Sequence, residues 1–439
     1  MSYRIGIRRE DKNEWERRVP LSPSDVGTLK REHDIITVLQ PFPARAYKDP
    51  EFLAVGAEID ENLTGCNVVL GVKEMPLNFF REGITYAFFS HVIKGQAYNM
   101  PMLKKILDTG CNLIDYEKIT DEKGARLVFF GREAGQAGMV DSLWALGERL
   151  RGEGIENPFT DIRHATEYRG MSFIEDALSL LAKDITAKGI PDSIHPVVIG
   201  FAGYGNVSVG AQSILDHIPV IDISPSELLN PSADTFSLKN HIYKVVFKEE
   251  HLVEPAQPGG VFELQDYYKH PEKYKEIFEN YIPHLTVLMN CIFWSEKYPR
   301  LLTKEFTKKF YSASTSPKLK VVGDISCDLH GAVEVNVKTA NPGNPVYVYD
   351  IDKDEAIDGT EGNGPVILAV DNLPAELPRE ATTRFSHSLT PLIPGIVKAD
   401  MTVPFDKVEL PGPIKRAVIC YHGKLTPDFE YLYEFLGDL

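Results

Sequence analysis

Cysteine is scarce in this chain, and its spacing excludes two classes of site. The 439 residues contain five cysteines, which are Cys66, Cys111, Cys291, Cys327 and Cys420. The number is odd, the spacing is wide, and no Cys-x-x-Cys pair is present to bind a metal or exchange thiols. A disulfide-stapled scaffold is therefore excluded, and a reducing compartment fits best.

Long apolar runs are also missing. The longest, residues 285–294, is interrupted by Asn290 and is too short to span a bilayer. Residues 3–9 contain no apolar core of the kind found in signal peptides. From these absences we expect a cytoplasmic protein without a membrane anchor.

Positive charge is in deficit, with 47 Lys and Arg against 63 Asp and Glu and a formal net charge of −16. Such a surface repels phosphate backbones and anionic lipids, and the sequence has no basic patch that would overcome this repulsion. We therefore expect small-molecule substrates, with no nucleic acid or membrane as partner, while a homo-oligomeric state stays open. The length and the hydrophobic content of 43% suit two packed domains.

Short apolar runs alternate with helix-patterned segments in the first third of the chain, which is typical of β-α units in a parallel sheet. We expect strands at 3–7, 67–72, 86–90 and 112–115. Ionisable residues follow these strands: Arg17 and Arg18 after the first, then Lys73, His91 and Glu117. Ligands bind beyond the carboxyl ends of strands in open α/β sheets, so these side chains are expected to converge on a site. Taken singly, a Lys, His or Glu at a strand end is usually just a solvated side chain.

The clearest motif is a glycine-rich turn between an expected strand at 196–201 and an expected helix that ends at His217. Gly203 would form the tight turn, Gly205 would let the backbone approach a pyrophosphate, and Gly210 would let the helix pack closely. The free N–H groups at the start of the helix, which begins with Asn206 and Val207, would point at the phosphates. The third glycine comes five positions after the second, which is a variant spacing, but the position between strand and helix favours dinucleotide binding.

A second short strand, expected at 220–223, supplies the candidates for binding the adenosine ribose. These are Asp222 and, at the tip of the strand, Ser224. If Ser224 occupies the tip, no carboxylate repels a ribose phosphate, and NADP(H) is then slightly favoured over NAD(H).

An acidic segment near the C-terminal third matches a calcium loop only in part. Asp350, Asp352, Asp354 and Glu361 fall at positions 1, 3, 5 and 12 of that template. Position 6 is Glu355, where the sharp turn requires glycine. We therefore expect a solvated hairpin turn there, and no metal site in the chain.

Several segments resemble a known family. The opening segment 8–23, RREDKNEWERRVPLSP, is similar to the N-terminus shared by alanine dehydrogenases, transhydrogenase nucleotide domains and lysine-forming saccharopine dehydrogenases. The lysine-ketoglutarate reductase half of aminoadipic semialdehyde synthase is resembled at 71–74, 86–96, 113–118, 205–211, 299–303, 323–328 and 371–381. The animal and plant enzymes carry a second, saccharopine-cleaving half, for which 439 residues leave no room, so we expect a single-function enzyme.

The resemblance implies reductive condensation of L-lysine with 2-oxoglutarate to saccharopine, with NADPH as hydride donor, or the reverse oxidation. Lys73 and His91 would be the acid–base pair, and Glu74 and Glu117 would tune their pKa values. Such a reaction needs both a base and an acid near neutral pH.

The resemblance also implies ligands for substrate and cofactor. Arg18 and Arg126 match carboxylate-binding arginines, whose planar forks suit that task. The positions that match residues facing the nicotinamide are Asp328, Asp371, Asn372 and Leu373.

The implied fold class is α/β, with two Rossmann-like domains whose parallel sheets flank an interdomain cleft. Residues 1–135 plus 378–439 would form the substrate (catalytic) domain, and residues 136–377 the dinucleotide-binding Rossmann domain. Helices are expected at 133–151, as a connection between the domains, and at 171–188. The cleft would hold the active site and close on ligand.

Three alternatives stay open. An NAD-dependent, lysine-forming saccharopine dehydrogenase of the fungal type would share Lys73, His91 and Arg18 and differ in coenzyme. An alanine dehydrogenase-like enzyme would use ammonia, although the insert at 262–281 argues against it by its length. A non-catalytic NAD(P)-binding regulator would bind without turnover, although it would have no need of Lys73, His91 and Glu117 together.

Overall fold

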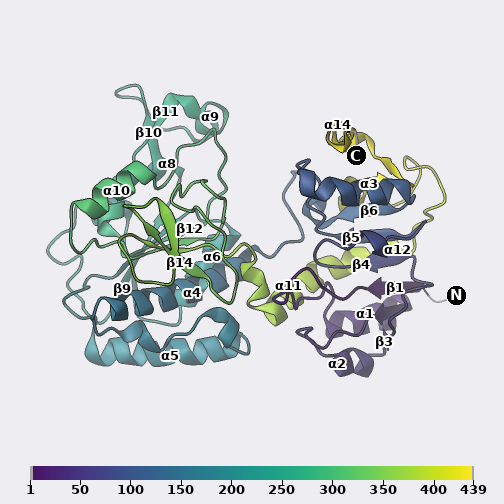
Figure 1. Ribbon diagram of the computed structural model, residues 1–439, viewed down its shortest axis with the longest axis horizontal. Coiled ribbons are helices and arrows are strands. Elements are labelled where there is room, and N and C mark those ends of the chain that lie inside the picture. The colour runs from purple at the N-terminus through teal and green to yellow at the C-terminus, as the bar shows by residue number, and fades with distance from the viewer. Residues whose placement is uncertain (1–2, 438–439) are drawn as a thin grey trace. The chain divides into compact units, whose positions relative to one another are not determined.

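The computed structural model describes residues 3–437, and this part of the chain forms two compact units (Figure 1). The first unit contains the chain up to Phe130 and again from Pro378 onward, and the second contains Gly131–Leu377. Each unit has hydrophobic core clusters of its own. The fold class is α/β, as predicted, because each unit is built on a mostly parallel sheet. In residues 3–437, no helix combines the length and the apolar character that crossing a membrane requires.

The first unit has one eight-stranded sheet. Its strands are β1 (Tyr3–Ile7), β2 (Ile35–Leu39), β3 (Glu58–Ile59), β4 (Val68–Leu70), β5 (Thr85–Phe88), β6 (Asn112–Asp115), β17 (Val418–Tyr421) and β18 (Lys424–Leu425). Their order is β18-β17-β6-β5-β4-β1-β2-β3. The first six are parallel, whereas β17 and β18 add an antiparallel edge. The four strands predicted from apolar runs are present, and β2 is an additional strand.

Helices of the first unit pack around this sheet. They are α1 (Pro23–His33), α2 (Asp49–Ala54), α3 (Met100–Asp108), α11 (Pro378–Leu389), α12 (Ile393–Val397), α13 (Gly412–Ala417) and α14 (Tyr433–Leu436). Ser22 caps α1 by accepting a hydrogen bond from the N–H of Asp25 at 3.2 Å. The chain that returns at α11 is fixed to the segment after β1, since the N–H of Val19 donates to Oγ1 of Thr382 at 3.1 Å.

The second unit has a second eight-stranded sheet. Its strands are β7 (Val198–Ala202), β8 (Val220–Asp222), β9 (Ile242–Phe247), β12 (Val287–Asn290), β13 (Val321–Asp324), β14 (Val346–Asp350), β15 (Glu355–Asp358) and β16 (Val366–Leu368). Their order is β15-β14-β16-β13-β12-β7-β9-β8, and every neighbouring pair is parallel except β15–β14 and β14–β16. A separate antiparallel pair joins β10 (Val253–Pro255) and β11 (Tyr274–Glu276). Both sheets are thus mostly parallel, as expected, with antiparallel pairing at one edge of each.

Seven helices lie in the second unit. They are α4 (Gly131–Gly152), α5 (Met171–Lys188), α6 (Asn206–Leu215), α7 (Pro225–Leu229), α8 (Glu249–Leu252), α9 (Leu264–Lys269) and α10 (Lys304–Ser312). The predicted helix at 171–188 has the bounds of α5, and the one at 133–151 corresponds to α4. Where α4 crosses α6, a Cβ on Gly135 would lie 1.9 Å from the carbonyl oxygen of Val207. The two backbones touch there, which only glycine allows.

Two further features bear on the sequence predictions. Asp350 pairs with Glu355 across a hairpin between β14 and β15, so the predicted hairpin turn is confirmed. The strand that follows α6, β8, lies at the outer edge of the sheet and pairs with β9. It is β9 that pairs with β7, the strand before the glycine turn.

Candidate functional site

Lys73 is placed by a buried carboxylate at the end of β1. Glu10 is 3% exposed, and its two oxygens accept hydrogen bonds from the backbone N–H groups of Val72 and Lys73, at 2.7 and 3.0 Å. Burial, with a contribution from the charge of Glu16, raises the pKa of Glu10 to about 7. Glu10 therefore fixes the direction in which the chain leaves β4, and with it the Lys73 side chain.

The ammonium group of Lys73 lies in an environment that disfavours its charge. Burial lowers the pKa of Lys73, and the positive charge of Arg18 lowers it further, while Glu16 and Glu74 act in the opposite sense. A lysine with a lowered pKa gives up its proton more readily than a free lysine does. Its surroundings therefore fit the predicted acid–base role, which stays a proposal.

His91 and Glu74 form a close pair beside Lys73. Nδ1 of His91 lies 2.7 Å from Oε1 of Glu74, and Nζ of Lys12 donates to both oxygens of Glu74 at 2.9 and 2.8 Å. Burial acts against ionisation of Glu74, but the hydrogen bonds from His91 and Lys12 outweigh it and lower its pKa to about 2. With a carboxylate on Nδ1, the Nε2 of His91 is the nitrogen left to exchange a proton with a substrate.

The backbone of His91 is held in the left-handed region, with φ of 52°. Its carbonyl oxygen accepts a hydrogen bond from Nδ2 of Asn99 at 3.1 Å, which helps to hold this conformation. Non-glycine residues with such φ values cluster at functional sites, where the surrounding structure maintains them.

Arg18 already binds a carboxylate of the chain. Its side chain is 2% exposed, and its Nε and Nη2 donate to both oxygens of Glu16 at 2.7 and 2.5 Å. The guanidinium carbon lies 4.3 Å from the ring centre of Phe130, a cation–π contact. Arg18 is thus part of the polar cluster around Lys73, and its predicted contact with a substrate carboxylate stays a proposal.

Glu117 and Arg126 form a second pair of predicted residues. They make an ion pair in which 52% of the Arg126 side chain and 14% of that of Glu117 are exposed. Glu117 follows β6, and its N–H donates to Oδ1 of Asp115 at 2.8 Å. Among the two predicted carboxylates, it is Glu74 that contacts His91.

The glycine turn in the second unit has the geometry that dinucleotide binding requires. Gly203 has φ of 96°, as a tight left-handed turn demands. Gly205 is the N-cap of α6, so no side chain caps this helix end. A Cβ on Gly205 would meet nothing within 4 Å, and its backbone is therefore open to a ligand. A Cβ on Gly210 would lie 2.1 Å from the carbonyl oxygen of Arg132 in α4. Asn206 begins α6, and the open backbone at its start fits a pyrophosphate.

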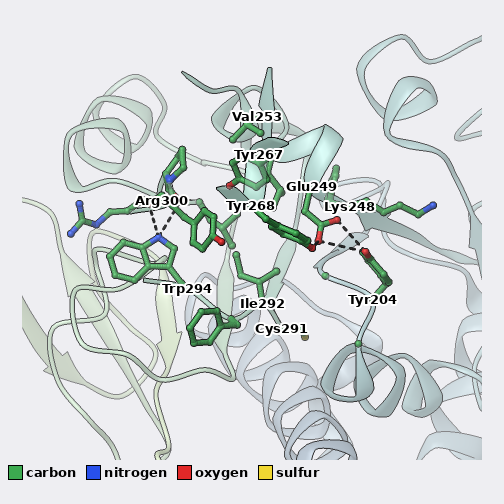
Figure 2. A pocket seen from close by; sticks show the side chains of 18 residues that line it. Tyr204, Lys248, Glu249, Val253, Tyr267, Tyr268, Cys291, Ile292, Trp294 and Arg300 are labelled. Carbon is green, nitrogen blue, oxygen red and sulfur yellow. Dashed lines mark hydrogen bonds between the residues drawn. The ribbon is translucent and has the colours of Figure 1, made fainter. Parts of the chain in front are cut away.

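A cavity of about 410 Å³ begins at this turn (Figure 2). Its lining comes from the carboxyl ends of β7, β9 and β12 and from α9, and includes Gly203, Gly205, Lys248, Glu249, Tyr267 and Trp294. The carboxylate of Glu249 accepts hydrogen bonds from the hydroxyls of Tyr268, at 2.5 Å, and Tyr204, at 3.2 Å. The volume is in the range of cofactor pockets.

Asp222 and Ser224, the predicted ribose ligands, are not among the residues that line this cavity. Asp222 forms an ion pair with Nζ of Lys244 at 2.9 Å, and Ser224 caps α7 by accepting a hydrogen bond from the N–H of Glu227 at 3.2 Å. Asp222 is the last residue of β8 and Ser224 comes two residues later, and β8 is separated from β7 by β9. They lie one strand further from the glycine turn than a ribose ligand is expected to lie.

The positions matched to the nicotinamide lie after β13 and β16. Asp328 and Asp371 are exposed. Burial, followed by the charge of Asp324, raises the pKa of the Cys327 thiol, and the charges of Asp371 and Asp328 raise it further. Both aspartates therefore lie near this sulfur. Asn372 is buried, and Leu373 belongs to the core cluster that contains α4. Leu373 therefore has a packing role, whereas the two aspartates lie at the carboxyl edge of the sheet.

Sequence reasoning missed several residues of both sites. Glu10 and Glu16 lie in the opening charged segment, close in sequence to Arg18. This closeness was the available signal that they belong to the same polar cluster. Glu249 and Tyr268 gave no local signal, because their place depends on the order of the strands. In residues 3–437, no group of three or more His, Cys, Asp or Glu side chains is arranged to hold a metal ion.

Comparison with known proteins identifies relatives over most of the chain. Residues 6–137 match the family model for the alanine dehydrogenase/PNT N-terminal domain. The mitochondrial alpha-aminoadipic semialdehyde synthase of Mus musculus is 35% identical over 442 residues, which cover 98% of this chain and 47% of that protein. The chain thus spans about half the length of this relative.

A second relative and a solved structure also match most of the chain. The NAD(+), L-lysine-forming saccharopine dehydrogenase of Emericella nidulans is 27% identical over 414 residues, covering 89% of this chain and 91% of that protein. An L-alanine dehydrogenase structure is 16% identical with a TM-score of 0.64, covering 99% of this chain and all of its own, and shares the fold. The chain is therefore similar to aminoadipic semialdehyde synthases over nearly its whole length and, at lower identity, to lysine-forming saccharopine dehydrogenases, and its residues 6–137 match the alanine dehydrogenase/PNT N-terminal domain model.

Proposed function

We propose that this chain is an oxidoreductase that joins L-lysine and 2-oxoglutarate into saccharopine, reversibly, with a nicotinamide dinucleotide as the hydride carrier. The observation that carries the proposal is the cluster of Lys73, Glu74 and His91, in a chain 35% identical over 98% of its length to an aminoadipic semialdehyde synthase. NADP(H), which the sequence favours, and NAD(H), which the name of the fungal relative carries, are the candidate coenzymes.

The chemistry requires protons to move at the substrate nitrogen and oxygen. The neutral ε-amine of lysine attacks the keto carbon, the new carbon–nitrogen bond forms, and the nitrogen loses a proton while the former keto oxygen gains protons and leaves as water. Lys73, with its lowered pKa, and Nε2 of His91 are proposed to accept and donate these protons. The bound dinucleotide supplies or takes up hydride at the resulting carbon–nitrogen double bond.

The remaining predicted residues are proposed to orient the reactants. Arg18 and Arg126 would bind substrate carboxylates, and Asp328, Asp371 and Asn372 would face the nicotinamide. The open backbone at Gly205 and at the start of α6, which begins with Asn206 and Val207, would bind the pyrophosphate. A cytoplasmic location and a homo-oligomeric state stay predictions.

The proposal is tested by following nicotinamide absorbance with lysine and 2-oxoglutarate together, with each omitted, and with ammonia in place of lysine. We expect turnover only when both substrates are present. Lys73→Arg keeps a positive charge but cannot lose a proton, so we expect its rate to fall by about 100-fold or more. The exposed Lys94→Arg is the matched control. Turnover of 2-oxoglutarate with ammonia in place of lysine would contradict the proposal. A Lys73→Arg rate equal to that of Lys94→Arg would contradict it as well.

A further inference from the structure

The order of the strands moves the ribose site away from the residues that the sequence suggested. In dinucleotide-binding sheets, the carboxylate that binds the adenosine ribose comes from the end of the strand beside the glycine-turn strand. In this chain β7 pairs with β12 on one side and with β9 on the other, from Val198↔Tyr243 to Ala202↔Phe247. Of the two, β9 lies on the side of β8, the strand that follows the glycine turn and its helix, so β9 takes this place. The residues directly after β9 are Lys248 and Glu249, and both line the cavity that begins at the glycine turn.

Glu249 is held in place within that cavity. Tyr268, from α9, and Tyr204, from the glycine turn itself, both donate hydrogen bonds to its carboxylate. Figure 2 shows Glu249 between these two tyrosines, above Ile292 and Cys291. A carboxylate accepts more than two hydrogen bonds, so this arrangement leaves it able to accept from a ribose diol as well.

The cations that line the cavity do not offset the charge of Glu249. Lys248 is exposed, and Figure 2 shows its side chain extending away from Glu249 and Tyr268. Arg300 donates to the carbonyl oxygens of Gly331 and His330, at 3.1 and 3.0 Å, and stacks over Trp294. A phosphate on the 2′-oxygen of the ribose would therefore meet a carboxylate, and repulsion between like charges in a partly desolvated pocket disfavours that contact.

The far side of the cavity suits a flat, apolar ring. Tyr267 is 5% exposed and packs on Tyr298, with ring centres 5.4 Å apart. Trp294 is fixed by its Nε1, which donates to the carbonyl oxygens of Tyr298 and Pro299 at 3.0 Å each. Rigid aromatic walls beside a carboxylate provide for a purine and its ribose in one continuous cavity.

We propose that Glu249, positioned by Tyr204 and Tyr268, binds the ribose hydroxyls of the adenosine half of the coenzyme, and that the chain therefore selects NAD(H) over NADP(H). The inference rests on the proposed function only in that a dinucleotide binds at the glycine turn. It reverses the preference drawn from Ser224, which lies at the end of the outermost strand of the sheet.

The test is a pair of equilibrium titrations of the full chain, one with NADH and one with NADPH, without lysine or 2-oxoglutarate. We expect NADH to bind at least about tenfold more tightly. Glu249→Gln should weaken NADH binding by about tenfold to a hundredfold, the range for a hydrogen bond to a charged group, and leave NADPH binding unchanged or stronger. Tyr268→Phe should have the same effects as Glu249→Gln, weaker binding of NADH and unchanged or stronger binding of NADPH, but by a smaller factor. Glu250→Gln, the exposed neighbour, should change neither.

Competition by nucleotide fragments gives a second readout that uses only the unaltered chain. We expect 5′-AMP to displace NADH at lower concentration than adenosine 2′,5′-bisphosphate. Tighter NADPH binding, equal effects of Glu249→Gln on both coenzymes, or no dinucleotide binding would overturn the inference. Selective NADH binding without turnover of lysine and 2-oxoglutarate would overturn the proposed reaction and leave the coenzyme inference supported.

Discussion

Glu74 is the residue that joins the two candidate proton-transfer groups. It accepts from His91 and Lys12, and its charge acts against the lowering of the Lys73 pKa. Because its own pKa is about 2, it is a carboxylate throughout the neutral range. A single side chain therefore fixes the ring orientation of His91 and contributes to the electrostatic environment of Lys73.

Glu74→Gln tests this role through stability. The folded-state pKa of about 2 lies below the ordinary 4.5, so the stabilisation is complete above pH 4.5 and is lost as pH falls towards 2. We expect the variant to lower the free energy of unfolding at pH 7 by about 1–2 kcal/mol, a figure reduced for solvent screening at this partly exposed site. Urea unfolding from pH 7 down to pH 3 should show the difference shrinking below pH 4.5. The exposed Glu122→Gln is the control, and a difference independent of pH would contradict the assignment.

At the scale of elements, the glycine turn and the crossing of α4 over α6 use glycine for two different reasons. Gly205 faces open space, whereas Gly135 and Gly210 each face the backbone of the opposite helix at about 2 Å from an added Cβ. The first glycine leaves room for a ligand, and the other two leave room for the protein itself. One segment therefore carries both a binding requirement and a packing requirement.

Alanine substitutions separate these requirements. Gly205 has φ of −76°, which alanine adopts without strain, so Gly205→Ala should keep the unfolding free energy of the protein and weaken dinucleotide binding. Gly210→Ala would force two backbones apart, and we expect a loss of about 1–3 kcal/mol in stability. Thermal unfolding and dinucleotide titration of both variants provide the check. A Gly205→Ala protein that binds as tightly as the parent, or a fully stable Gly210→Ala protein, would contradict the respective assignment.

Local signals were enough to predict α4, α5, α6, several of the buried strands and the polar residues that follow those strands. The bounds of α5 match the predicted helix, and Lys73, Glu74 and His91 meet because two neighbouring parallel strands, β4 and β5, end at one edge. The order of β8 and β9 could not be predicted, because it depends on which strand pairs with β7 and not on any pattern within a strand. Glu249 was missed for the same reason.

At the scale of the whole molecule, the chain leaves the first unit at Phe130 and returns at Pro378. The second unit is therefore an insertion in the first, and the first is completed by contacts between residues more than 350 positions apart in the chain, such as Val19 with Thr382. The second unit makes its own core from residues within 131–377. This topology predicts that a substitution that destabilises the core of the first unit disturbs the Lys73 cluster and leaves the dinucleotide cavity of the second unit unchanged.

Thr382→Val tests this separation. The substitution removes the oxygen that accepts the buried N–H of Val19, and an unsatisfied buried N–H costs about 1–3 kcal/mol. We expect lower stability and faster hydrogen exchange in peptides from residues 3–130 and 378–437, and unchanged exchange and NADH affinity for residues 131–377. Thr383→Val, which alters an exposed neighbour, is the matched control. If NADH affinity fell together with the stability of the first unit, the two cores would be energetically coupled, and the cavity beside Glu249 would depend on the first core as well as on its own.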